Sequence, residues 1–96
     1  MAIIRVTVRT FQNLEHAELF LSIGEGTRDG LNKAGLAAKF TISQSISQPN
    51  RVVSVWEYKD KDHMNEVREF LSAQSRLPNS LAPKEIAYET KVIHSS

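Results

Sequence analysis

A strand followed by a helix is encoded twice in this chain, as IIRVTVRTFQNLEHAELFL at residues 3–21 and as VVSVWEYKDKDHMNEVREFL at residues 52–71. The first part of each copy alternates in polarity, as strands do, and the second part repeats apolar residues at helical spacing. A further strand-like run follows each copy: AAKFTISQSISQ at 37–48 and KEIAYETKVI at 84–93. The order βαββαβ predicts an α+β, ferredoxin-like fold, with a four-stranded antiparallel sheet and two helices on one face.

The two copies superpose at an offset of 50 residues. At this offset the apolar positions pair as Leu14 with Met64, Ala17 with Val67, Phe20 with Phe70, Leu21 with Leu71, Val6 with Trp56 and Val8 with Tyr58. The first strand is expected at 2–10, and Asn13 is expected to cap a single imperfect helix that runs to about Ala34 and ends at a left-handed Gly35. The remaining elements are expected in this order: a strand at 39–47, a turn at 48–50, a strand at 51–58, a helix capped by Asp60 and ended by Leu77-Pro78, a loop at 78–83 and a strand at 84–93.

Composition restricts the class of protein. The length of 96 residues favours a single domain, expected at 1–94, and a formal net charge of +1 argues against nucleic acid or an anionic membrane as a partner. The chain contains no cysteine, which excludes disulfides and thiolate metal sites. No run approaches the ~20 apolar residues of a membrane span, and Arg5 interrupts the apolar N-terminal stretch. We therefore expect a soluble, cytoplasmic protein.

Alternation along the strands assigns side chains to the two faces of the sheet. The apolar face expected beneath the helices carries Ile4, Val6, Val8, Val53 and Val55. The helix-free face is expected to carry Arg5, Thr7, Arg9, Thr41, Ser43, Ser54, Trp56, Tyr58, Glu89 and Lys91. Two large aromatic residues on a helix-free face indicate a covered surface. We therefore expect a homodimer in which two such faces close a barrel around a half-polar cavity for a small aromatic or acidic organic ligand.

The strand order and the segment VVSVWEYKDKDHMNEVREFLSAQ at 52–74 resemble the dimeric α/β-barrel superfamily, nearest to antibiotic biosynthesis monooxygenase-type proteins. The sharpest element of the resemblance is Trp56-Glu57 at a strand end, followed almost at once by a helix. The resemblance covers nearly the whole chain as a pattern. It implies cofactor-free oxygenation of electron-rich aromatics, as in some relatives, or haem degradation, as in others. Trp56 stands where relatives place a pocket tryptophan.

This sequence departs from both groups of relatives. Haem-degrading relatives use an asparagine on the first strand and a histidine late in the second helix, where this chain has Arg5 or Thr7 and, near the second place, Gln74. Polyketide-oxidising relatives carry an asparagine four residues before the tryptophan, and that position is Val52 here. We therefore expect no bound cofactor, and haem degradation is predicted to be absent.

The residues singled out for ligand binding are Arg5, Thr7, Arg9, Ser43, Ser54, Trp56 and Tyr58, of which Trp56, Tyr58 and Arg5 are the candidates for a catalytic role. Each has a structural alternative. Trp56 and Tyr58 could pack in a dimer interface instead. The two arginines could bind a carboxylate or phenolate, or could form cross-strand ion pairs with Glu85 or Glu89.

Two further patterns predict no site. His16 and His63 fall in the first turns of the two helices, and with Asp60 or Asp62 they could approach a metal, but they lack HxxxH-type spacing. Gly24, Gly26 and Gly30 resemble a phosphate loop, yet they do not follow a strand.

Two functions are consistent with these patterns. One is a small oxygenase or isomerase acting on an aromatic or quinone-like molecule inside the barrel. The other is a non-catalytic ligand-binding or stress-associated dimer. An enzyme should surround an open cavity with Trp56, Tyr58 and an arginine, whereas a structural dimer should fill that space with its own side chains.

Overall fold

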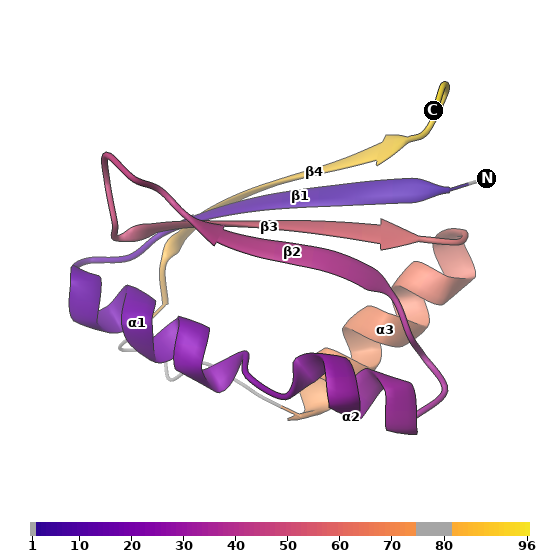
Figure 1. Cartoon of the computed structure of the whole chain (residues 1–96), viewed down its shortest axis with the longest axis horizontal. Helices are drawn as coiled ribbons and strands as arrows, with labels where there is room; N and C mark the ends of the chain where they lie inside the picture. The colour runs from indigo at the N-terminus through magenta and orange to yellow at the C-terminus, as the bar shows by residue number, and fades with distance from the viewer. Residues whose placement is uncertain (1, 75–81) are drawn as a thin grey trace.

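The computed structural model describes residues 2–74 and 82–96, and these residues contain one four-stranded sheet with helices on one side (Figure 1). The strands are β1 (Ile3–Thr10), β2 (Lys39–Gln44), β3 (Arg51–Tyr58) and β4 (Lys84–Lys91), in the order β2-β3-β1-β4. Every neighbouring pair is antiparallel. The predicted ferredoxin-like βαββαβ fold is therefore confirmed.

The first helical segment consists of two helices, α1 (Leu14–Ile23) and α2 (Thr27–Lys33), and the prediction of one helix is wrong. The chain turns at Gly26, whose φ of 83° lies in the left-handed region that glycine adopts without steric cost. Thr27 then donates its hydroxyl to the carbonyl of Gly24 at 2.7 Å, which fixes the start of α2. A glycine costs a helix interior roughly 1 kcal/mol relative to alanine, so a turn is the better use of closely spaced glycines.

The predicted helix caps are confirmed. Asn13 Oδ1 accepts the backbone N–H of His16 at 2.9 Å, and Asp60 Oδ1 accepts that of His63 at 2.8 Å at the start of α3 (Lys61–Gln74). Gly35 follows α2 with a φ of 73°. The two capping residues lie 47 positions apart, whereas the fully buried Ala17 and Val67 pair at the predicted offset of 50. The predicted helix end at 77–78 lies outside the described residues.

The predicted faces of the sheet are reversed for β1, β3 and β4, whereas Thr41 and Ser43 of β2 lie on the helix-free face as predicted. The face beneath the helices carries Ile3, Arg5, Thr7 and Arg9 of β1, Val52, Ser54, Trp56 and Tyr58 of β3, and Phe40 and Ile42 of β2. Thr7, Ser54 and Tyr58 are each only 2% exposed. The prediction failed because it assigned polar strand residues to the helix-free face, whereas polar side chains can be buried when they find partners.

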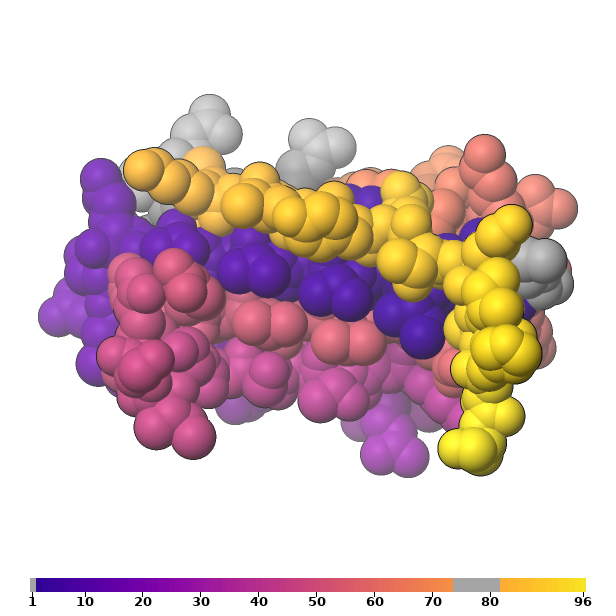
Figure 2. Space-filling view, turned by 90° about the horizontal axis from the view of Figure 1, so that it is seen from above, coloured from indigo at the N-terminus to yellow at the C-terminus, as the bar shows by residue number. Residues whose placement is uncertain are grey.

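The helix-free side of the sheet, which we call the open sheet face, carries an apolar group in its middle, with polar residues on β2 and at the strand ends. Its apolar members are Ile4, Val6 and Val8 of β1, Val53 and Val55 of β3, and Ile86 and Tyr88 of β4. Figure 2 views this side, where β4, β1, β3 and β2 lie next to one another with no helix over them. Val55 is 36% exposed, Ile86 57% and Tyr88 60%. Trp56 and Tyr58 do not belong to this face, so their predicted role as its interface aromatics is wrong.

Three strands are shorter than predicted, β1 by the one residue at its start, and β3 agrees in both bounds. Because β2 ends at Gln44, Ile46 lies beyond the strand and is fully exposed. The fourth strand ends at Lys91, before the predicted end at residue 93. The predicted loop at 78–83 falls largely outside the described residues. Within residues 2–74 and 82–96, no helix has the length and apolar character that crossing a membrane requires.

Candidate functional site

A partly open cavity of about 310 Å³, which we call the internal cavity, lies between the covered face of the sheet and the helices. Its lining includes six of the seven residues predicted to bind a ligand: Arg5, Thr7, Arg9, Ser54, Trp56 and Tyr58. Ser43, the seventh, lies on the opposite side of the sheet, where its hydroxyl donates to the carbonyl of Val53 at 3.4 Å. Six of these residues were thus predicted together. Their position is the interior of one chain, and not the dimer barrel that the sequence led us to expect.

Stacked aromatic rings form one wall of the internal cavity. The ring centroids of Trp56 and Tyr58 are 6.0 Å apart with an interplanar angle of 7°, and Phe40 stacks on the other side of Trp56 at 4.3 Å. Alternation along β3 places Trp56 and Tyr58 on the same side of the strand, and packing against Leu31, Met64 and Val67 limits their movement. A flat, rigid aromatic wall favours a flat ligand.

Arg9 is held in place by three different contacts. It donates to Ser54 Oγ at 3.1 Å, pairs with Glu85 at 3.5 Å and lies over the ring of Phe20 with its Cζ atom 5.0 Å from the centroid. Burial lowers the pKa of the Arg9 guanidinium, Glu85 raises it and the charge of Arg5 lowers it. An arginine titrates so far above neutral pH that Arg9 stays charged. The cavity therefore contains a fixed guanidinium.

Arg5 is likewise paired, with Glu89 at 3.3 Å. The β1–β4 register sets Arg5 opposite Glu89 and Arg9 opposite Glu85, so both pairs are direct cross-strand neighbours. The alternative interpretation of these arginines, as partners of carboxylates on the fourth strand, is confirmed. Both guanidinium charges are therefore compensated within the chain.

Arg68 of α3 also lines the cavity, and the sequence analysis did not identify it. It forms no ion pair with any residue that the structure describes. It lies one helical turn after Met64, on the flank of the buried stripe that Met64 and Val67 begin, and this spacing was the available signal. Among the described residues that line the cavity, Arg68, which is exposed to solvent, is therefore the cation without a carboxylate partner.

Tyr58 brings a neutral hydroxyl to the cavity. Burial raises its pKa, the nearby charges of Arg68 and Arg5 lower it, and Glu89 raises it. Burial is the largest of these effects, so the phenol holds its proton at neutral pH and can donate a hydrogen bond.

Other candidate residues do not join this site. His63 Nδ1 accepts the backbone N–H of Lys59 at 3.0 Å, so the proton on Nε2 points to the carbonyl of Ala37 at 3.1 Å. Neither ring nitrogen is left for a metal, and no group of three metal-ligating side chains occurs among residues 2–74 and 82–96. Val52, at the position of the relatives' asparagine, is fully buried against Phe11 and Ala17. The side chain of Gln74 lies outside the described part of the structure.

Known proteins resemble this chain in structure but not detectably in sequence. No protein-family profile and no curated protein sequence matches the chain. A dimeric ferredoxin-like protein from an uncultured marine organism has a TM-score of 0.79 and 22% identity, with 99% of this chain and 98% of that one covered. A second such protein from an uncultured marine organism has a TM-score of 0.75 and 17% identity, with 98% and 93% covered.

The comparison also includes an enzyme. A variant of SnoaB, a cofactor-independent oxygenase from Streptomyces nogalater, has a TM-score of 0.69 and 14% identity, with 98% of this chain and 95% of that one covered. Identities this low establish the fold alone. The chain therefore has a ferredoxin-like fold, as its sequence resemblance implied, and this fold is similar to those of the dimeric ferredoxin-like proteins and of SnoaB.

Proposed function

We propose that the internal cavity binds a planar, weakly acidic aromatic molecule as its anion. The observation that carries this proposal is the combination of stacked Trp56 and Tyr58 with Arg68, a guanidinium that has no carboxylate partner in the described chain. The flat wall suits a flat ring, and the uncompensated charge suits a phenolate or carboxylate. The volume of about 310 Å³ suits a molecule of two or three fused rings.

For the chemical step we propose cofactor-free monooxygenation of that anion. The ionised substrate transfers one electron to O2, and the two resulting radicals combine to form a carbon–oxygen bond. The ring carbon then loses its proton and the O–O bond breaks, which leaves a carbonyl on the ring and releases water. One phenol and one O2 thus give one quinone and one water, and the substrate supplies every electron.

In this proposal each side chain has a defined role. Arg68 stabilises the substrate anion, and Trp56 orients the ring. Tyr58, which stays protonated, donates a hydrogen bond to the developing peroxide oxygen. The paired Arg5 and Arg9 hold the polar end of the cavity in shape and are not the primary anion contacts.

The proposal is tested with 1-naphthol, whose oxygenation would give 1,4-naphthoquinone. The unmutated chain should consume one O2 per quinone formed, faster than buffer alone. Tyr58→Phe should retain binding of 1-naphthol measured by calorimetry but lower the rate of oxygen uptake about tenfold, because it removes the donor to the peroxide. Equal uptake with and without protein would contradict the enzymatic step.

The second candidate function is non-catalytic binding in the same cavity. The observation that favours it is that Arg5 and Arg9 are already paired with Glu89 and Glu85. The described lining of the cavity therefore offers one cation without a carboxylate partner and no unpaired carboxylate to act as a base. A carrier would bind 1-naphthol without any oxygen uptake. If no planar acid binds, a structural dimer is the remaining function.

We further propose that two copies of the chain associate through the open sheet face. Seven large apolar or aromatic side chains are exposed or half-exposed on this face, and contiguous apolar patches mark interaction sites. Two of the structurally similar proteins are described as dimeric. The interface would thus be formed by valines and isoleucines, and the ligand site would lie inside each chain, away from the interface.

A further inference from the structure

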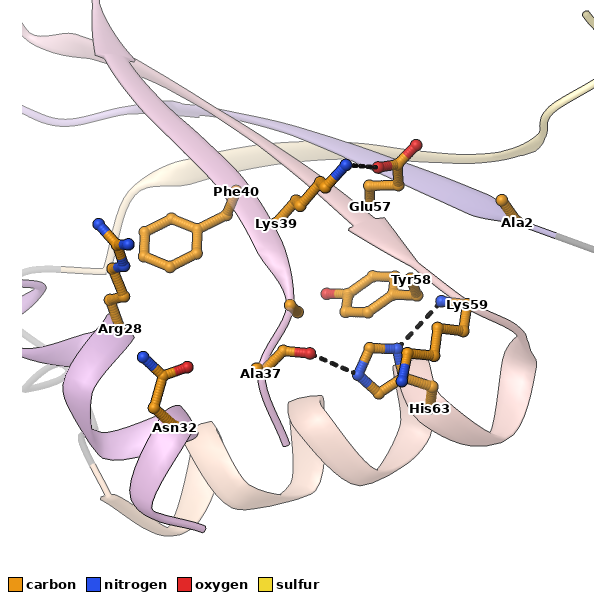
Figure 3. Close-up of a pocket in the computed structure, with 11 residues that line it drawn as sticks. Ala2, Arg28, Asn32, Ala37, Lys39, Phe40, Glu57, Tyr58, Lys59 and His63 are labelled. Atoms are coloured by element: carbon orange, nitrogen blue, oxygen red, sulfur yellow. Dashed lines mark hydrogen bonds and ion pairs between the residues drawn. The ribbon is translucent and has the colours of Figure 1, made fainter. Parts of the chain in front are cut away.

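A second, larger hollow of about 930 Å³ lies at the edge of the molecule, between β2, α2 and the first turn of α3 (Figure 3). We call it the edge groove. Among the described residues, only Tyr58 lines both the edge groove and the internal cavity. The edge groove therefore needs an explanation separate from the proposed oxygenase or carrier site.

Positive charge is concentrated in the edge groove. Three cations, Arg28, Lys39 and Lys59, line it together with one carboxylate, Glu57. The whole chain has a formal net charge of only +1, so this small region is more positive than the molecule around it. Lys39 and Glu57 approach to 3.9 Å at an exposed position, which is a weak pair. Arg28 and Lys59 form no ion pair with the described residues.

Neutral hydrogen-bond donors add to these charges. Asn32 lies one helical turn after Arg28 in α2, so both side chains project from the same helix face toward the hollow (Figure 3). Tyr58, which lines both hollows, lies on the other side of the edge groove. His63, whose Nε2 proton is directed to Ala37, offers no acceptor nitrogen. The edge groove is therefore rich in donors and poor in acceptors, which is the pattern of an anion site.

The remaining lining is apolar and partly aromatic. The ring of Phe40, held by stacking on Trp56, and the ring of Tyr58 form flat surfaces close to the cations. An inorganic anion would leave these surfaces unused, whereas an aromatic carboxylate would contact the rings with its apolar part and the cations with its charged end.

We propose that the edge groove is a second ligand site, which binds small aromatic carboxylates. Arg28 is the principal anion contact, because a guanidinium matches the geometry of a carboxylate and this one has no partner in the described chain. Asn32 contributes a neutral hydrogen bond, and Phe40 with Tyr58 binds the ring. The site is distinct from the internal cavity in position and in its cation.

The probe is 2-naphthoate, with 2-naphthamide as its uncharged equivalent, added to the full chain labelled with ¹⁵N. Binding of 2-naphthoate should shift the backbone amide signals of Ala37 and Ala38 and the side-chain amide of Asn32. We expect at least fivefold weaker binding of 2-naphthamide, because it lacks the charge. Equal affinity for the two compounds, or the absence of shifts at these three residues, would overturn the proposal.

Arg28→Gln should weaken binding of 2-naphthoate about five- to tenfold, which is the usual effect of losing one charge-assisted contact. Arg51→Gln is the matched control, because it removes the same charge from an exposed position at the far end of β3. An equal loss of affinity in both variants would mean that the affinity for 2-naphthoate depends only on the net charge of the chain, and would overturn the proposed site.

Arg68→Gln separates this inference from the proposed function. It should leave the 2-naphthoate shifts at Ala37 and Ala38 unchanged while it weakens binding of 1-naphthol in the internal cavity. If 2-naphthoate shifted only the amide signals of residues in the internal cavity, such as Thr7 and Ser54, the edge groove would be excluded as its binding site. The proposal that the internal cavity binds planar anions would then be unaffected.

Discussion

Tyr58 lines both hollows of the molecule, and its protonation state is set by its surroundings. Its side chain is 2% exposed and stacks on Trp56. Because burial raises its pKa above the ordinary value of 10.0, the folded chain holds this proton to higher pH than the unfolded chain does. Below pH 10, Tyr58 is protonated in both the folded and the unfolded chain, and its full contribution to the unfolding free energy is present. It is lost as the pH rises through the folded-state pKa.

Tyr58→Phe should therefore flatten the fall in unfolding free energy between about pH 10 and pH 12. The measurement is urea unfolding across this range, in the Tyr58→Phe variant and in Tyr88→Phe, which removes the other tyrosine from the open sheet face. A spectroscopic titration of the Tyr88→Phe variant should place the midpoint of Tyr58 above 10.0. A midpoint at or below that value would contradict the effect assigned to burial.

Individual residues of the candidate site were partly predictable from the sequence. The two-residue period of a strand groups Arg5, Thr7 and Arg9 on one side whichever way the sheet faces, so these residues line one cavity together. The side of the sheet to which these residues point was not predictable, since polarity alone does not determine which face the helices cover. Ile3 and Phe11 share the period of these residues and are the apolar signal for burial on that side. Arg68 was missed because a charge beside a buried stripe usually faces solvent.

At the scale of elements, the break between α1 and α2 divides the first helical segment into two helices that follow one another beneath the sheet (Figure 1). The helix starts were predictable, since a capping side chain acts within three residues. The break was not predictable from apolar periodicity, which continues through it. Gly26 and Gly30 show the difference: Gly26 has a φ of 83°, whereas Gly30 is an ordinary residue of α2.

Gly26→Ala should destabilise the chain by about 1 kcal/mol, because alanine is strained at positive φ. Gly30→Ala should stabilise it by roughly 0.5–1 kcal/mol, because the new methyl group meets only Phe70 at 4.0 Å, an ordinary contact, and alanine favours a helix. Thermal unfolding should thus shift by several degrees in opposite directions. A loss of stability in both variants would mean that α2 has no room for the added methyl group.

At the scale of the whole molecule, the open sheet face is the largest feature that one chain leaves uncovered. Val55→Asp would place a charge at its centre, so we expect a folded monomer with unchanged circular dichroism and a halved mass in sedimentation equilibrium. Leu19→Asp is the matched control, because Leu19 is 44% exposed in α1, on the other side of the molecule. A monomeric unmutated chain at micromolar concentration would contradict the proposed association.

The whole fold was the most predictable level, because the repeated strand–helix order and the resemblance at 52–74 both specify the βαββαβ arrangement. The location of the proposed ligand cavity was not predictable, because it depends on which face of the sheet the helices cover. The association that we propose uses the helix-free face, as the sequence-based prediction did, but that face carries different residues from those predicted. Trp56→Asp should accordingly disturb the core and the internal cavity first, and not the association of two chains.

The central claim is that the internal cavity recognises the anion of a planar aromatic through Arg68. The most direct test compares the calorimetric dissociation constants of 1-naphthol and 1-methoxynaphthalene near pH 9, in the unmutated chain, Arg68→Lys and Arg68→Gln. The unmutated chain should favour 1-naphthol about tenfold, Arg68→Lys should keep most of that preference, and Arg68→Gln should reduce it to near unity. Equal binding of the two compounds by the unmutated chain, or a preference that survives in Arg68→Gln, would contradict the account.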